Sequence, residues 1–169
     1  MDERTQEEPR AWDLEGATHR AGFKIEELVE FVRAASPSEE DFGQALSQLH
    51  QALDKAADKV AKKTPAQQDL IGQVDALIDT LYFTYGSFVL MGVDPERIFD
   101  IVHQANMGKI FPDGKAHFDP VTHKILKPDD WEEKYAPEPA IKKELQRQLK
   151  AYERHKERNN TQWKSKSKL

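Results

Sequence analysis

The sequence contains no cysteine, and this absence limits the chemistry that the protein can use. Disulfides, thiolate metal sites and a cysteine nucleophile are excluded, so any metal must be held by oxygen or imidazole ligands. Oxygen ligands favour Mg²⁺ or Mn²⁺. The sequence also has neither a glycine-rich phosphate loop nor an HExxH motif, which leaves the P-loop and zincin mechanisms unsupported.

Long hydrophobic runs are missing as well. No stretch reaches the roughly 18 consecutive apolar residues that a membrane-spanning helix needs. The first ten residues, MDERTQEEPR, have neither the basic start nor the apolar segment of a signal peptide. We therefore expect a cytoplasmic protein that has no membrane partner.

The composition, with 38% hydrophobic and 33% charged residues in a chain of 169, supports one domain with its own core. We place this domain at 16–158, between a polar N-terminal tail (1–15) and a basic C-terminal tail (159–169). Residues 141–169 hold ten Lys or Arg against three Glu, whereas the rest of the chain is acidic. A basic end can contact nucleic acid, but a lysine-rich segment is more often solvated, so nucleic acid is not an expected partner.

Hydrophobic residues recur every three or four positions along most of the chain, which is the spacing of amphipathic helices. The pattern predicts helices over about 18–34, 39–62, 65–91, 96–107 and 139–158. Capping boxes that begin with Ser36 and Thr64 are expected to start the second and third helices, and Gly92 to end the third. The predicted fold class is all-α, a bundle of four or five helices.

The segment 110–131 differs from the predicted helices on either side. Three turn signals, Asp113-Gly114, Asp119-Pro120 and Lys127-Pro128, divide it into short pieces. These pieces predict a long irregular loop before the last helix, with hairpin character but no core sheet. A loop of about twenty residues inside a compact domain is usually functional or disordered.

The most apolar part of the chain, 73–92 (QVDALIDTLYFTYGSFVLMG), contains two aspartates, Asp75 and Asp79. Four residues apart on a helix, they lie on one face, and burial of carboxylates without a partner is costly. The pair therefore predicts a positive charge nearby. This could be a bound metal cation, or a lysine or arginine from another helix. The aromatic residues of this segment could stack on a base, but such a stripe on a bundle helix more often belongs to the core.

A second acidic group lies in the pattern EExxE, formed by Glu26, Glu27 and Glu30. Spacings of three and four residues bring these side chains together on one helix face. Alone, such a cluster is more often a solvated surface. If this face meets Asp75 and Asp79 across the core, the carboxylates share one site, and their mutual repulsion requires divalent cations.

Together with HQANMGK at 103–109, and with DGK and KP..W in the loop, these acidic segments resemble the all-α nucleoside triphosphate pyrophosphohydrolases. That superfamily contains MazG, phosphoribosyl-ATP pyrophosphohydrolase and the dimeric dUTPases. The resemblance covers roughly 23–131. It implies hydrolysis of a nucleoside triphosphate, in the first place a dNTP, to the monophosphate and pyrophosphate. It also implies Mg²⁺ or Mn²⁺ as cofactor and a homodimer or homotetramer.

The resemblance assigns roles to the acidic residues of both helices. Glu27, Glu30 and Asp79 would bind the metal, and Glu26 would bind a further metal or orient water. From the chemistry alone, without the resemblance, Glu26 or Glu30 could take the proton of the attacking water. Which of the two takes the proton stays open.

The second acidic motif departs from the family pattern ExxD. Ala76 stands at the position of the glutamate, and Asp75, one position earlier, is a candidate replacement as metal ligand. The interval between Glu30 and Asp75 is long and holds an additional amphipathic helix. These departures keep a second hypothesis open, in which the chain is a non-catalytic helical module that binds a nucleotide or a protein.

Contacts to the substrate are expected from the later part of the chain. The resemblance assigns them to Asn106 and Lys109, one turn apart. Lys115 and Lys127 in the loop could reach phosphates, although loop lysines are often only solvated. The sequence does not identify the base or the sugar of the nucleotide, or the phosphorus atom that is attacked.

Overall fold

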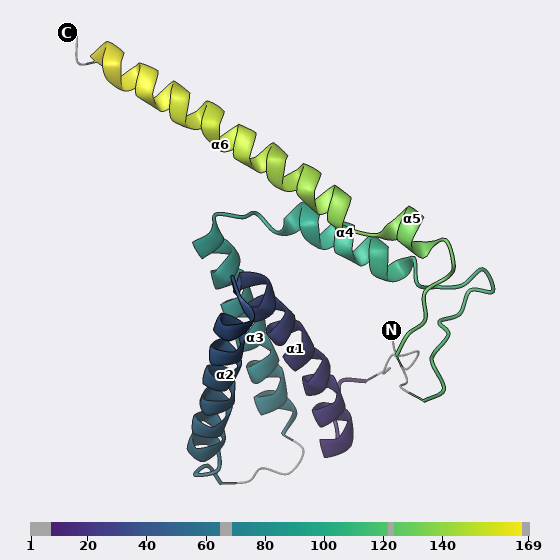
Figure 1. Ribbon diagram of the computed structural model, residues 1–169. Helices are drawn as coiled ribbons and strands as arrows, with labels where there is room; N and C mark the ends of the chain where they lie inside the picture. Colours follow the sequence, from purple (N-terminus) through teal and green to yellow (C-terminus); the bar gives the residue numbers. More distant parts are fainter. Residues whose placement is uncertain (1–7, 65–68, 122–123, 167–169) are drawn as a thin grey trace. The chain divides into compact units, whose positions relative to one another are not determined.

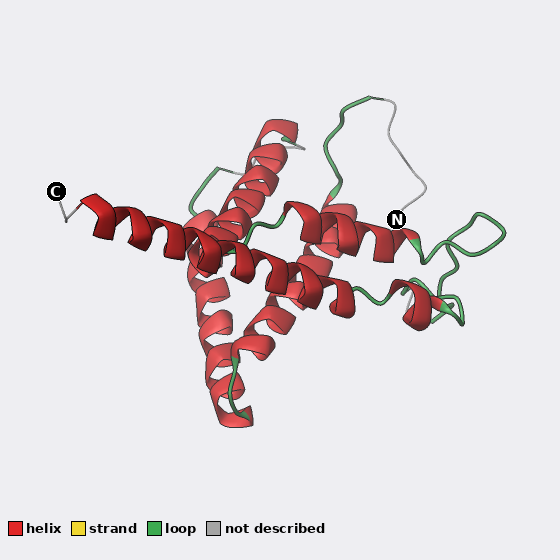
Figure 2. Cartoon of the chain, turned by 90° about the horizontal axis from the view of Figure 1, so that it is seen from above, coloured by secondary structure: helices red, strands yellow, loops and turns green. Residues whose placement is uncertain are grey.

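The computed structural model describes residues 8–64, 69–121 and 124–166, with the side chains of the last helix as far as residue 159. These residues form α1 (Leu14–Ala35), α2 (Glu39–Val60), α3 (Leu70–Met91), α4 (Glu96–Met107), the one-turn α5 (Trp131–Tyr135) and α6 (Glu138–Lys166) (Figure 1). Strand-like pairing in the described residues is confined to two isolated bridges, and Figure 2 shows only helices and loops there. The all-α prediction is therefore confirmed. The chain divides into two compact units, one ending at Ile78 and the other beginning at Asp79.

The first helix begins earlier than its hydrophobic pattern indicates. The side chain of Asp13 accepts a hydrogen bond of 2.8 Å from the backbone nitrogen of Gly16 and so acts as the N-cap of α1. The helix therefore starts at Leu14 and not near residue 18. The last two residues of the predicted polar tail (1–15) thus belong to α1.

The prediction that Ser36 caps the second helix is wrong. Ser38 is the N-cap of α2, since its hydroxyl accepts from the backbone nitrogen of Asp41 at 3.1 Å. Ser36 ends α1 instead, and its hydroxyl donates to the carbonyl oxygen of Val32 at 2.7 Å. The residue before a proline avoids the helical conformation, and Ser36, which precedes Pro37, has an extended backbone. The first serine therefore closes one helix and the second opens the next.

The third helix has caps at both ends. The carboxylate of Asp69 accepts from the backbone nitrogen of Gly72 at 3.0 Å, which satisfies one of the free donors of the first turn. At the other end, Gly92 has a φ of 68°, and the nitrogen of Val93 donates to the carbonyl oxygen of Phe88 at 3.0 Å. This arrangement is a Schellman cap, so the predicted stop at Gly92 is confirmed. The predicted capping box that ends at Gln67 lies outside the described residues.

α3 is apolar on nearly all sides, yet it has no buried residue among those described. Leu90 is 91% exposed, and Tyr82 and Phe83 are exposed by 74% and 72%. The expectation that the aromatic stripe belongs to the core is thus wrong for the single chain. A helix that is apolar all round is normally covered by protein or lipid, and no described helix is long and apolar enough to cross a bilayer.

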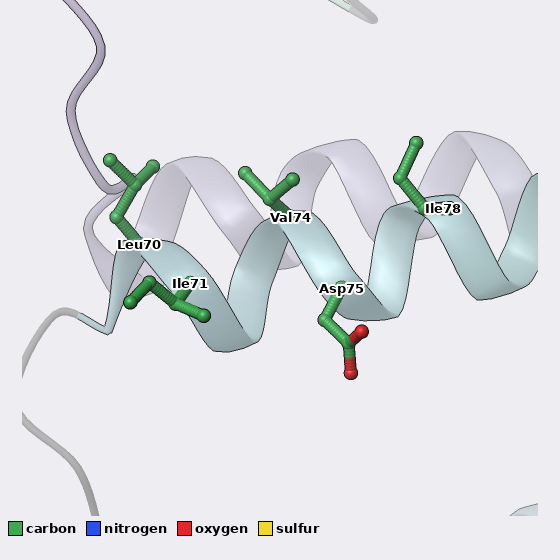
Figure 3. Close-up of a pocket in the computed structure, with 5 residues that line it drawn as sticks. All are labelled: Leu70, Ile71, Val74, Asp75 and Ile78. Carbon is green, nitrogen blue, oxygen red and sulfur yellow. The ribbon is translucent and has the colours of Figure 1, made fainter.

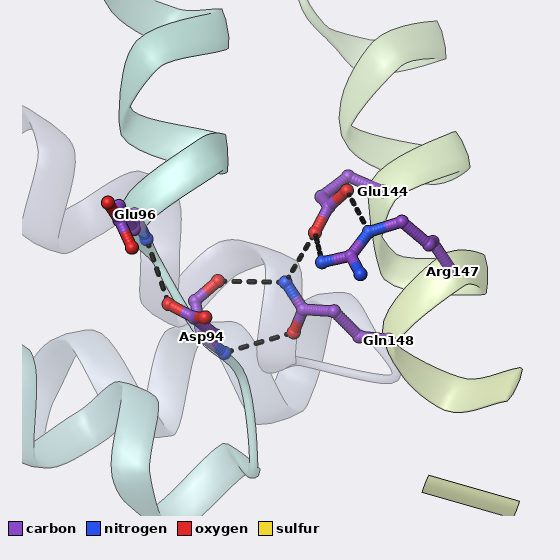
Figure 4. A network of polar contacts seen from close by, with 5 residues as sticks. All are labelled: Asp94, Glu96, Glu144, Arg147 and Gln148. Carbon is purple, nitrogen blue, oxygen red and sulfur yellow. Dashed lines mark hydrogen bonds and ion pairs between the residues drawn. The ribbon is translucent and has the colours of Figure 1, made fainter. Parts of the chain in front are cut away.

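In the second unit, α4 and α6 lie side by side in both views and are joined at the start of α4 (Figures 1 and 2). The side-chain amide of Gln148 accepts from the backbone nitrogen of Asp94 at 3.0 Å and donates to its carbonyl oxygen at 2.9 Å (Figure 4). The same amide nitrogen donates to Glu144 at 3.0 Å, and Glu144 also accepts two bonds from Arg147, of 2.7 and 2.6 Å. These bonds, from Arg147 first and Gln148 second, lower the pKa of the Glu144 carboxyl to about 2.

The last helix is longer than predicted. It begins at Glu138 and continues to Lys166, beyond the expected end at 158. No proline or glycine follows Pro139 in the sequence, so no residue there breaks the helix. Much of the predicted basic tail is therefore helical.

The loop between α4 and α5 has the predicted irregular hairpin character. Gly114 has a φ of 79° and closes a turn by donating to the carbonyl oxygen of Phe111 at 2.8 Å. Isolated antiparallel bridges follow at Ile110–Ala116 and Phe118–Ile125. The ring of His117 stacks on that of Phe111, with 4.2 Å between centroids. The same imidazole contacts the carboxylate of Asp113 at 2.8 Å and lowers its pKa.

Candidate active site

Asn106 and Lys109, the predicted substrate-contacting pair, are in direct contact. Asn106 lies in the last turn of α4, and the ammonium group of Lys109 donates to its side-chain oxygen at 2.8 Å. The amide nitrogen of Asn106 donates to the carbonyl oxygen of Val102 at 3.1 Å. The helix backbone therefore orients the amide, and the amide in turn holds the lysine.

Trp131, the first residue of α5, packs against the same turn of α4. Its side chain is 5% exposed, and its indole nitrogen donates to the carbonyl oxygen of Ala105 at 2.8 Å. Four residues later, the ring of Tyr135 covers Gly108, which is buried. These two contacts fix α5 to the end of α4, although the residues involved are more than twenty positions apart in the sequence.

Lys127 reaches this region from the end of the loop. Its ammonium nitrogen lies 3.8 Å from the centre of the Trp131 ring, and that of Lys109 lies 5.9 Å from it. Lys127 also donates to the carboxylate of Glu132 at 2.8 Å. That ion pair is exposed, by 44% for Lys127 and 73% for Glu132, and exposed pairs contribute little and exchange readily. Two of the four predicted substrate residues, Lys109 and Lys127, thus lie over one indole ring, and Asn106 is linked to them through its hydrogen bond with Lys109.

The fourth, Lys115, occupies a different place. Its backbone nitrogen donates to the carboxylate of Asp113 at 3.0 Å, and its carbonyl oxygen accepts from Phe111 at 2.9 Å. Both contacts lie within the turn, so Lys115 is placed by the turn and not by α4 or Trp131. Its side chain is exposed, and its role in substrate binding stays a prediction.

The acidic residues of the first unit are solvated. Glu26, Glu27 and Glu30 are all exposed on α1. Asp75 is exposed as well and borders an open groove of about 390 Å³ on α3, whose other lining residues are Leu70, Ile71, Val74 and Ile78. Figure 3 shows Leu70, Val74 and Ile78 on one side of the helix and Asp75 with Ile71 on the other.

The expectation that the aspartates of α3 are buried is wrong for the single chain, because the helix that carries them is uncovered. Asp79 is exposed like Asp75, and it belongs to the second unit. In the described parts of the chain, no three histidine or acidic side chains gather closely enough to hold a metal ion. The donors are nonetheless all carboxylates, which is the ligand type that Mg²⁺ and Mn²⁺ prefer.

Trp131 is the residue that the sequence alone did not single out. It appeared only as the last letter of KP..W, in a polar segment with no hydrophobic period. One signal pointed to it: Trp131 is a large aromatic residue among charged ones, and a buried tryptophan usually finds a hydrogen-bond partner for its indole N–H. What it anchors is visible only in the structure.

Comparisons with known proteins show which family the chain resembles. Residues 1–106 match the family of phosphoribosyl-ATP pyrophosphohydrolase, abbreviated PRA-PH. A crystal structure from Exiguobacterium sp. 255-15, of a candidate NTP pyrophosphohydrolase, shares 40% identity with the chain and has a TM-score of 0.79. The similarity covers 88% of this chain and 89% of that one. No curated protein matches the sequence.

The family match spans more than half of the chain and includes both acidic helices and most of α4. The structural similarity extends over nearly the whole length. The predicted resemblance and the prediction of a pyrophosphohydrolase enzyme are confirmed. The chain belongs to the phosphoribosyl-ATP pyrophosphohydrolase family.

Proposed function

We propose that the protein hydrolyses a nucleoside triphosphate, in the first place a dNTP, to the monophosphate and pyrophosphate, with Mg²⁺ or Mn²⁺ as cofactor. One observation carries the proposal: within this family fold, Asn106, Lys109 and Lys127 meet at one end of α4. Two ammonium groups and an oriented amide form a suitable receptor for phosphate oxygens. We also propose that the protein acts in the cytoplasm.

The metal is proposed to be held by the carboxylates of α1 and α3. Glu27, Glu30 and Asp79 are the proposed ligands, with Glu26 at a further metal or at the attacking water, and Asp75 as an additional ligand in place of the glutamate missing at position 76. When bound, the cation supplies neutralisation of the phosphate oxygens and an orienting centre for the substrate. The exposure of all five carboxylates leaves them accessible to a metal.

Side chains of the protein carry out the proton transfer and stabilise the leaving group. Glu26 or Glu30 takes the proton of the attacking water. Lys109 and Lys127 stabilise the negative charge that develops on the leaving pyrophosphate. Asn106 keeps Lys109 in place through the hydrogen bond of 2.8 Å.

We further propose that the protein works as a homodimer or homotetramer. The uncovered apolar surface of α3 supports this, since exposed side chains such as Leu81, Tyr85 and Val89 would otherwise face water. A second copy of the chain is the partner that is always present. Its contact would also change the surroundings of Asp75 and Asp79, which lie on the same helix.

Two observations favour a second function. Ala76 replaces a family ligand, and no metal-binding group of three forms among the described residues of the single chain. A module that binds nucleotide or protein without hydrolysis would retain the lysine site and lack the metal. In that case nucleotides would raise the melting temperature without being consumed.

The two functions are separated by one experiment. The protein is incubated with each dNTP and NTP in the presence of Mg²⁺ or Mn²⁺, and released pyrophosphate is measured. Turnover of at least one nucleotide, lost when the metal is chelated, is the expected result. No turnover with any nucleotide, together with no rise in melting temperature on addition of metal, would contradict the enzymatic proposal.

A further inference from the structure

The buried hydrophobic residues of the described part of the chain lie at the end of α4. Among the described hydrophobic residues only Ala105 and Trp131 are buried, at 4% and 5% exposure. They are hydrogen-bonded to each other through the indole nitrogen and the carbonyl oxygen. A buried and hydrogen-bonded indole has a fixed ring plane. The aromatic rings of α3 are uncovered and are not fixed in this way.

We propose that Trp131 is a positioning residue, whose ring holds the ammonium groups of Lys109 and Lys127 as a joint receptor for the pyrophosphate moiety of the substrate. The inference rests on the proposed function for the identity of the substrate. It deepens that function because it explains why two lysines 18 positions apart in the sequence, one after α4 and one in the loop, serve one ligand.

The geometry of the contacts supports a positioning role. An ammonium group over an indole face is attracted by the negative face of the ring, and Trp is the strongest of the aromatic residues in this respect. Lys127 lies at 3.8 Å from the ring centre, well inside the range of the interaction, and Lys109 lies at its limit with 5.9 Å. Asn106 restrains Lys109 from the other side. Both long side chains therefore lose freedom before a ligand arrives, which lowers the entropic cost of binding.

The charges left at the site also suit an anion. Lys127 is neutralised in part by Glu132, but this ion pair is exposed. A pyrophosphate group carries several negative charges and can displace a solvated carboxylate from the ammonium group. The residues of this receptor beyond Asn106 follow residues 1–106, the part of the chain that matches the family.

Two substitutions distinguish the effect of the aromatic ring face on binding from the effect of packing. Trp131→Phe keeps an aromatic face for the ammonium groups, whereas Trp131→Leu removes it, and both lose the hydrogen bond to Ala105. By titration calorimetry we expect Trp131→Leu to weaken the binding of inorganic pyrophosphate by about fivefold to tenfold, and Trp131→Phe by less than about threefold. The KM for the nucleotide should rise in the same order. Trp12→Leu, the same exchange in the other unit, serves as the control and should bind pyrophosphate like the wild type.

Equal weakening in the Phe and Leu variants would overturn the proposal, because a purely structural indole affects both alike. A second measurement applies if Trp131→Leu does not fold. In a variant with Trp12→Phe and Trp163→Phe, Trp131 is the only tryptophan. Pyrophosphate should change its fluorescence emission, because the phosphate oxygens bind the ammonium group that lies over the ring, and Lys127→Met should abolish that change. Unchanged emission at high pyrophosphate concentration would contradict the proposal.

The two proposals fail separately. Binding of pyrophosphate requires no turnover, so a Trp131-dependent affinity without hydrolysis of any nucleotide would overturn the proposed function alone. Hydrolysis combined with equal pyrophosphate affinity of the Phe and Leu variants would overturn the positioning role alone.

Discussion

Gly108 faces the ring of Tyr135 so closely that a Cβ at this position would lie 2.7 Å from both Cδ1 and Cδ2 of the ring. The backbone of Gly108 is helical, with a φ of −64°, so alanine would fit its conformation. The requirement for glycine is therefore steric. Because Tyr135 belongs to α5, this contact fixes the helix that carries Trp131 to the end of α4.

Gly108→Ala is predicted to destabilise the fold by about 1–3 kcal/mol, the usual cost of a methyl group without space. Thermal unfolding is the measurement. Gly43→Ala in α2 is the matched control, since a Cβ there meets nothing within 4 Å, and it should stabilise the helix by about 0.5–1 kcal/mol. In a Tyr135→Ala background the cost of Gly108→Ala should shrink. An unchanged cost in that background would contradict the assigned contact.

Asp79→Asn is predicted to lower kcat by at least about 100-fold, since even residues that only support metal ligands are worth 10–100-fold. The exchange preserves shape and removes the charge, and Asp79 is exposed, so the melting temperature without metal should stay close to that of the wild type. Asp54→Asn on α2 is the control and should leave kcat unchanged. An Asp79→Asn variant as active as the wild type would show that the metal site is misplaced.

The stability of the second unit should depend on pH through Glu144. Its pKa is about 2 in the fold, below the ordinary value of 4.5. A carboxyl group with a lowered pKa stabilises the folded state fully above its ordinary pKa, and this contribution is lost as the pH falls toward the folded value. The melting temperature of the wild type should therefore fall more between pH 4.5 and pH 2 than that of Glu144→Gln.

Glu153→Gln, at an exposed position of the same helix, controls for the general effect of acid. It should follow the wild type over this pH range. Identical slopes for the wild type and Glu144→Gln would mean that the bonds from Arg147 and Gln148 do not stabilise the fold.

The apolar surface of α3 predicts an assembly of two or four chains. Sedimentation should give a mass of at least twice 19.4 kDa. Leu90 is 91% exposed in the single chain, and Leu90→Glu should shift the assembly toward the monomer, because a buried carboxylate without a partner is costly. Gln51→Glu, with the same charge on the exposed part of α2, should leave the mass unchanged. A wild-type protein that sediments as a monomer would contradict the prediction.

The helices could be predicted because they depend on local information. The spacing of hydrophobic residues predicted the five long helices of the described residues. Gly92 predicted the end of α3, and the structure shows its positive φ there. One error occurred where two nearby residues compete for one role: Ser36 and Ser38 can both cap, and only the extended backbone before Pro37 decides between them.

The site could be predicted only in part, for a physical reason. Sequence spacing places Asn106 next to Lys109, one turn apart on a helix, and the structure confirms this contact. It does not place Lys127 beside them, because that depends on Trp131 reaching Ala105 across a loop. The hydrophobic run around Asp79 indicates a covered helix, but a sequence does not state what covers it.

We propose that this chain cleaves nucleoside triphosphates to the monophosphate and pyrophosphate with a divalent cation. The most direct test follows the products of the best nucleotide by ³¹P nuclear magnetic resonance, once with Mg²⁺ and once with chelator. We predict signals of the nucleoside monophosphate and pyrophosphate with Mg²⁺, and unchanged triphosphate with chelator. Formation of the diphosphate and inorganic phosphate, or equal turnover in the presence of chelator, would contradict the account.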